Sequence, residues 1–97
     1  MTTISEIKDI LDKHKSYIKE RFKVDEIGIF GSYVRSEQTN ESDVDMLVTF
    51  KEPIDFFLFL DLEDYLSDLI GKKVDLVMKR ALKTDIGKSI IEETIYV

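Results

Sequence analysis

The run DVDMLVTF, residues 43–50, constrains the fold of this chain most strongly. It is β-branched and apolar, and its only charges, Asp43 and Asp45, stand at its start. Central strands that are buried in a sheet have this composition. The run therefore predicts a central strand with two carboxylates at the point where a polar loop, residues 38–42, enters it.

Helical and strand-like segments alternate on both sides of this run. Thr3 and Asp55 are good N-caps for apolar stripes at helical spacing, and Gly71 is a good C-cap. The expected order is a helix over 3–21, a strand over 24–30, a short helical turn from 31, the strand 43–50, a helix over 56–70, a strand over 74–78, a helix over 84–93 and an edge strand over 95–97. This order predicts an α+β, two-layer fold: a short mixed sheet of about three to four strands with helices packed mainly on one face.

Length and charge limit what the chain can do. Ninety-seven residues predict a single domain, 1–97, without room for a second substrate-binding domain. The 14 basic and 20 acidic residues give a net charge of −6, which disfavours direct nucleic-acid binding. The N-terminus lacks the apolar core of a signal peptide, and no apolar run approaches the roughly 20 residues of a membrane span. With no cysteine to suggest disulfides, the expectation is a cytoplasmic protein.

Two features leave alternatives open. His14 is the only histidine and falls on the apolar stripe of the first helix. It fits a stripe-edge residue with one solvated ring nitrogen better than a catalytic one. In the helix 56–70, the residues FFLFL widen the apolar surface beyond one stripe. That helix is either deeply buried, which is the more common case, or offers a surface to a partner.

The paired carboxylates are the first candidate for chemistry. Asp43 and Asp45 alternate along a strand, so they share a face about 6.5 to 7 Å apart. Unpaired, they repel each other and at least one pKa should rise. A divalent cation removes the conflict, and carboxylate oxygens suit Mg²⁺. The alternative is an acidic, solvated loop end, which the pair alone does not exclude.

A second candidate follows the first predicted strand. Gly31 and Ser32 end an apolar run and open a short helix, where glycine lets backbone N–H groups approach a phosphate. The Ser32 hydroxyl adds a donor, and Arg35, one turn on, can reach the same phosphates. An ordinary strand-to-helix turn with a surface arginine is the alternative.

Asp75 is the third candidate. It is the one charge in the strand-like run VDLVM, residues 74–78. If that strand lies beside 43–50, Asp75 can join Asp43 and Asp45. A metal cluster would give a reason for a charge on such a strand, because burying an unpaired carboxylate is costly; a charge at the strand end is the alternative.

Gly-Ser, ten residues, then Asp-x-Asp resembles the signature of the DNA polymerase β-like nucleotidyltransferase superfamily. The string FGSYVR and the short length resemble its minimal nucleotidyltransferases, the MNT-type antitoxins of prokaryotic toxin–antitoxin pairs. The resemblance extends from the first helix through the third strand. One departure is Ser36, where family members commonly have glycine, and it concerns the geometry of the turn.

The resemblance implies a polymerase β-like fold and a set of roles. Asp43, Asp45 and Asp75 would hold two Mg²⁺ ions and carry the catalysis. Gly31 and Ser32 would hold the β- and γ-phosphates of a nucleoside triphosphate, with ATP expected, and the chain would transfer AMP.

The resemblance also implies a protein acceptor: a tyrosine of a cognate HEPN-domain toxin, which the chain would silence as its antitoxin. Neutralisation by binding alone, through the helix 56–70 and the acidic surface, is the main alternative. Modification of a small molecule would need a larger acceptor pocket, which a homo-oligomer could build. The sequence fixes neither the nucleotide base nor the oligomeric state.

Overall fold

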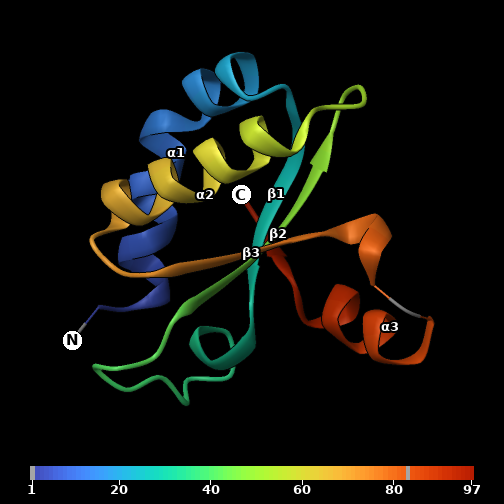
Figure 1. The fold of residues 1–97 in the computed structure, drawn as a ribbon. Helices are drawn as coiled ribbons and strands as arrows, with labels where there is room; N and C mark the ends of the chain where they lie inside the picture. The colour runs from blue at the N-terminus through green and yellow to red at the C-terminus, as the bar shows by residue number, and fades with distance from the viewer. Residues whose placement is uncertain (1, 83) are drawn as a thin grey trace.

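The computed structural model describes residues 2–82 and 84–97, and its centre is a four-stranded mixed sheet (Figure 1). The strands are β1 (Val24–Phe30), β2 (Val44–Phe50), β3 (Val74–Met78) and β4 (Ile95–Tyr96), in the order β3-β2-β1-β4. β2 runs antiparallel to β1 and parallel to β3, while β4 runs antiparallel to β1. The predicted α+β fold with a short mixed sheet is confirmed, and residues 44–50 form one of its two central strands.

Helices α1 (Ile4–Arg21) and α2 (Phe56–Ile70) lie side by side over one face of the sheet (Figure 1). Their predicted caps are confirmed, because the Thr3 hydroxyl accepts the Glu6 N–H at 3.3 Å and the Asp55 carboxylate accepts the Leu58 N–H at 2.9 Å. Gly71 ends α2 in the left-handed conformation. The shorter α3 (Thr84–Glu93) lies apart from them and leads into β4.

The core fills the space between these two helices and the sheet. The residues that are at most 2% exposed and belong to this core are Ile7, Leu11, Ile18, Val24, Ile27, Ile29, Tyr33, Val44, Met46, Val48, Leu62, Leu66 and Val74. Among the described residues, none that is polar or charged is buried. The covered face is therefore an apolar contact, with the buried Tyr33 hydroxyl as a polar exception that has no hydrogen-bond partner among the described residues.

The face assignment along β1 needs one correction. Strict alternation predicts that Val24 points away from Ile27 and Ile29. The structure instead places all three in the same core, because the pairing with β2 shifts register between Val24 and Glu26. Such a bulge adds one residue to the strand and reverses the phase of every side chain beyond it.

The structure shows the surroundings of the two features that the sequence left open. His14 is half-buried, and its Nδ1 lies 2.9 Å from the Ile10 carbonyl oxygen, as fits a stripe-edge residue. Helix α2 buries Leu62 and Leu66, yet Phe56 is 65% exposed and Phe57 is 76% exposed. The helix is thus buried along one side and presents aromatic side chains at its N-terminal end. Within residues 2–82 and 84–97, no helix combines the length and the apolarity that a membrane span requires.

Candidate functional site

The end of β1 and the start of β2 bring Gly31 against Asp45. Phe30 and Asp45 are register partners, so the chain turns directly beside Asp45 as it leaves β1. Gly31 has a φ of 80°, which favours glycine, and a Cβ there would overlap Oδ2 of Asp45. The predicted phosphate turn and the predicted carboxylate are therefore neighbours, and a side chain at residue 31 would require backbone strain and a shift of Asp45.

The parallel pairing of β2 and β3 brings Asp75 to the same place. Asp45 and Asp75 are register partners on these two strands. Asp43 immediately precedes β2 and is exposed, with Oδ2 3.8 Å from Nζ of Lys73. Asp75 is exposed as well, so it is not a buried core charge. The predicted condition that β3 lies beside β2 is met, and the three carboxylates share one edge of the sheet.

The electrostatics of this edge centre on Asp45. Its pKa is raised above the ordinary value, first because the half-buried side chain loses solvent, and then because Asp75 and Asp43 repel its negative charge. The nearby Arg35 lowers the pKa and Glu93 raises it, but the net direction is upward. Asp45 therefore lies in a region that is short of positive charge.

The turn after β1 is a single 3₁₀ turn, Gly31–Tyr33, anchored by Tyr33, which is only 1% exposed. The Gly31 carbonyl accepts the N–H groups of Val34 and Arg35 at 3.0 and 3.2 Å. The half-buried Ser32 hydroxyl makes no hydrogen bond within the described part of the chain. Ser36 has a φ of 59°, so this position does adopt the conformation that glycine favours.

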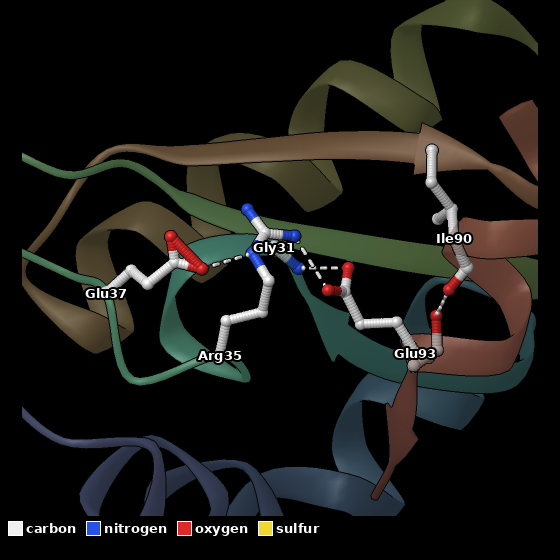
Figure 2. Close-up of polar contacts among 6 residues, drawn as sticks. Gly31, Arg35, Glu37, Ile90 and Glu93 are labelled. Atoms are coloured by element: carbon white, nitrogen blue, oxygen red, sulfur yellow. Dashed lines mark hydrogen bonds and ion pairs between the residues drawn. The ribbon is translucent and has the colours of Figure 1, made fainter.

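Arg35 does not point freely into solvent. Its Nε donates to Oε1 of Glu37 at 2.9 Å, and its Nη1 donates to Oε1 of Glu93 at 2.6 Å. The other oxygen of Glu93, Oε2, accepts the Gly31 N–H at 3.0 Å. Figure 2 shows the Glu93 carboxylate on one side of Gly31 and the Arg35 guanidinium, in contact with both, and Glu37 on the opposite side of Arg35. A carboxylate therefore contacts both the predicted phosphate turn and the predicted phosphate-binding arginine.

Sequence reasoning missed Glu93 because it lies 62 residues from Gly31. Its place follows from the pairing of β4 with β1, in which Ile29 opposes Ile95 and Gly28 opposes Tyr96. Continuing that register by two residues sets Glu93 opposite Gly31. The sequence would point to Glu93 only if the pairing of the last residues with β1 were already known.

The carboxylates match Mg²⁺ in chemistry without forming a complete cage. Among the described residues, no three His, Cys, Asp or Glu side chains converge tightly enough to hold a metal ion. Mg²⁺ characteristically takes one or two carboxylates and completes its shell with waters and substrate phosphates. Asp45, whose pKa is raised partly by two other carboxylates, fits a site that gains its cation together with a phosphate ligand.

A pocket of about 380 Å³ opens at the other end of β2 and β3. It is lined by residues 48–54 and 78–80, and none of the predicted site residues contributes to it. The carboxylate edge is the candidate site because three carboxylates and a backbone donor meet there, a combination that the lining of the pocket does not provide.

Comparison with known proteins decides the family. Residues 11–97 match the nucleotidyltransferase domain family. The chain belongs to this family. A 52% identical relative that the chain covers over 98% of its length, from Thermococcus cleftensis, is named protein adenylyltransferase MntA. A relative from Methanocaldococcus jannaschii, named as a candidate protein adenylyltransferase, is 62% identical over the full length of both chains.

Solved structures of nucleotidyltransferases share the fold. One described as a candidate minimal nucleotidyltransferase has a TM-score of 0.76 at 26% identity and covers 92% of this chain and 93% of its own. A toxin–antitoxin complex with AMP-PNP matches at a TM-score of 0.71 and 23% identity, over 88% and 70% of the two chains. A Shewanella oneidensis complex of a tri-AMPylated HEPN toxin with an MNT antitoxin matches at 0.67 and 21%, over 93% and 70%. These last two likenesses concern the fold alone.

Proposed function

We propose that this nucleotidyltransferase transfers AMP from ATP to a hydroxyl of a partner protein and so acts as the antitoxin of a HEPN-domain toxin. The observation that carries the proposal is the meeting of Gly31 with Asp45, and of Asp45 with Asp75, at one edge of the sheet. Close relatives named for protein adenylyltransferase activity support the type of reaction. A solved complex of an MNT antitoxin with an AMPylated HEPN toxin supports the kind of partner.

Asp43, Asp45 and Asp75 would hold two Mg²⁺ ions. Bound there, Mg²⁺ supplies the positive charge that offsets the repulsion among the carboxylates and polarises the phosphates. Asp75, exposed at the strand edge, is the group proposed to accept the proton of the attacking hydroxyl. The hydroxyl oxygen would form a bond to the α-phosphorus while the bond from the α-phosphorus to the oxygen shared with the β-phosphorus breaks, and pyrophosphate would leave.

The turn after β1 would bind and orient the leaving pyrophosphate portion. Gly31 offers a backbone N–H, and Ser32 offers the hydroxyl of a half-buried residue. The planar, charged guanidinium of Arg35 lies close to the Gly31 N–H, because both groups donate hydrogen bonds to the carboxylate of Glu93. Adenine as the base, a tyrosine as the acceptor and the cytoplasm as the place of reaction belong to this proposal.

The test is transfer of labelled AMP. The chain is incubated with labelled ATP, Mg²⁺ or Mn²⁺ and the product of the neighbouring gene, and protein-bound label is measured. Label on the partner that disappears in an Asp43→Asn, Asp45→Asn double variant is the expected result. An unlabelled partner with either metal would contradict the proposal, and label that survives in the double variant would remove these carboxylates from catalysis.

One observation favours a second candidate, neutralisation by binding alone. Phe56 and Phe57 are 65% and 76% exposed at the N-terminal end of α2, an unusual solvent exposure for aromatic side chains. They could contact a partner without any chemistry. The same double variant separates the two functions: if it neutralises the partner as fully as the wild-type chain, binding suffices.

A further inference from the structure

The carboxylate of Glu93 accepts from two of the three donors that the predicted phosphate turn offers to a nucleotide, the Gly31 N–H and Arg35, and leaves the Ser32 hydroxyl free of contact with it. Oε2 accepts the Gly31 N–H at 3.0 Å, and Oε1 accepts from Nη1 of Arg35 at 2.6 Å (Figure 2). A carboxylate matches a phosphate in the sign of its charge and in the kind of acceptor atom it presents. The two cannot occupy the same N–H group together.

Glu93 is fixed in this place by the fold. β4 pairs with β1 at Gly28–Tyr96 and Ile29–Ile95, and continuing that register by two residues sets residue 93 opposite residue 31. Gly28 allows this close approach, because a Cβ there would come within 2.5 Å of a side-chain atom of Thr94, the residue after Glu93. The Thr94 hydroxyl donates to the Ile90 carbonyl at 2.7 Å and holds the end of α3. The backbone position of Glu93 is therefore set by the pairing of β4 and by the end of α3.

The charge of Glu93 suits this place as well. Burial raises its pKa, but the Gly31 N–H and the Arg35 guanidinium outweigh burial and bring the pKa below the ordinary value. Glu93 is therefore ionised at neutral pH, and its side chain is only 20% exposed. The same negative charge adds to the forces that raise the pKa of Asp45. It would repel a triphosphate bound beside Asp45.

We propose that Glu93 is an internal competitor of the nucleotide: it occupies the Gly31 N–H and Arg35 in the free protein, and its carboxylate must leave them when the triphosphate binds. This inference rests on the proposed function, because it assumes that the turn binds phosphates. The competition lowers the apparent affinity for nucleotide by the fraction of molecules in which the turn is free. Glu93 thus determines affinity for the nucleotide without touching the reacting atoms.

The experiment compares Glu93→Gln with Glu92→Gln. Both variants remove one negative charge from neighbouring residues of α3, but Glu92 is exposed and makes no contact with Gly31 or Arg35 among the described interactions. The dissociation constant for AMP-PNP with Mg²⁺ is measured by calorimetry for both variants and for the wild-type chain. We expect Glu93→Gln to bind at least about fivefold more tightly than Glu92→Gln, because the competing anion is gone.

Each outcome decides between accounts. Equal affinity in the two variants would overturn the competition, and weaker binding by Glu93→Gln would show instead that Glu93 positions Arg35 for the nucleotide. In both of these cases the proposed function stands, because nucleotide is bound. Absence of AMP-PNP binding by all three proteins would remove the proposed function and the inference with it.

A measurement on the wild-type chain covers the case in which Glu93→Gln fails to fold. The side-chain carboxyl carbons of Glu93 and Glu92 are followed by NMR as AMP-PNP and Mg²⁺ are added. The competition predicts that the Glu93 resonance shifts toward the value of a solvated glutamate while that of Glu92 stays in place. An unchanged Glu93 resonance at saturating nucleotide would overturn the proposal.

Discussion

The helix-covered face of the sheet and its carboxylate edge differ in the kind of residue they contain. Under α1 and α2, the buried residues are apolar, and among the described residues no polar or charged one is buried. At the carboxylate edge, Asp43, Asp45 and Asp75 gather with Glu93, and the pKa of Asp45 is raised by burial and then by its acidic neighbours. The helix-covered face is fully packed in the free protein. At the edge, the repulsion among the carboxylates is not offset by enough positive charge.

This difference separates the residues that stabilise this small domain from the residues proposed to bind its ligands. Burial of apolar surface supplies the favourable free energy of folding. The edge instead costs free energy, because like charges face one another across β2 and β3. Such a cost is tolerated when a bound cation and an anionic ligand relieve it. Changes on the covered side should therefore alter folding, and changes at the edge should alter binding and transfer.

The largest effect is expected from Leu66→Ala on the covered side. Leu66 is fully buried between α2 and the sheet, so the change should lower the free energy of unfolding by about 2–5 kcal/mol. Chemical denaturation measures this loss. Leu60→Ala, in the same helix but at a residue 36% exposed, is the matched control and should cost much less. Equal losses of unfolding free energy at the two positions would contradict the conclusion that this side of α2 is the buried one.

The next largest effect separates the edge from an ordinary turn. Gly31 and Gly71 have φ values of 80° and 79°, so alanine at either position should cost about 1–2 kcal/mol of backbone strain. A Cβ at Gly31 would also overlap Asp45, whereas a Cβ at Gly71 meets nothing within 4 Å. Gly31→Ala should therefore cost more stability than Gly71→Ala and should alone abolish AMP-PNP binding in calorimetry. Nucleotide binding that survives in Gly31→Ala would remove the turn from the site.

A smaller gain is expected at Ser36, the one departure from the family's usual glycine. Its φ of 59° is left-handed, and relief of that strain by Ser36→Gly should raise the free energy of unfolding by up to about 1 kcal/mol. Ser16→Gly, in an exposed position inside α1, is the control and should lower stability by roughly 1 kcal/mol. Thermal unfolding compares the two, and a loss at Ser36→Gly would show that the hydroxyl has a role in the turn.

The smallest stability effect is expected from the titration of Asp45, and the direction in which stability changes with pH follows from its raised pKa. Its folded-state pKa is raised, so the protonated form is the one that folding favours. Its contribution to stability is present in full below the unfolded pKa and is lost as pH rises through the folded pKa. In metal-free buffer, the difference in unfolding free energy between Asp45→Asn and wild type should therefore grow in favour of the variant from about pH 4 toward neutral pH. A difference that does not vary with pH would contradict this assignment.

Local pattern was sufficient to predict most of the fold. Caps at Thr3, Asp55 and Gly71 and the apolar run of β2 are short-range signals, and the structure confirms each of them. The bulge after Val24 was missed because alternation in one strand carries no record of how its neighbour pairs.

The site divides in the same way. Gly31, Asp43 and Asp45 lie within one short stretch, so their spacing could be read directly. Asp75 required a guess about which strand neighbours β2, and the parallel register of β3 bears out that guess. Glu93 depends on the register of a two-residue strand at the end of the chain, and nothing in its local sequence points to Gly31.

The central claim is that the carboxylate edge is built for a cation and a nucleotide, and the stability of Asp45→Asn tests it most directly. At neutral pH in chelator, the account predicts that the variant is as stable as wild type or more stable by about 0.2–1 kcal/mol, because a repulsive pair is lost. With Mg²⁺ and AMP-PNP, wild type should gain stability and the variant should not. A variant that is less stable in chelator, or that gains as much from Mg²⁺ and AMP-PNP as wild type does, would contradict the account.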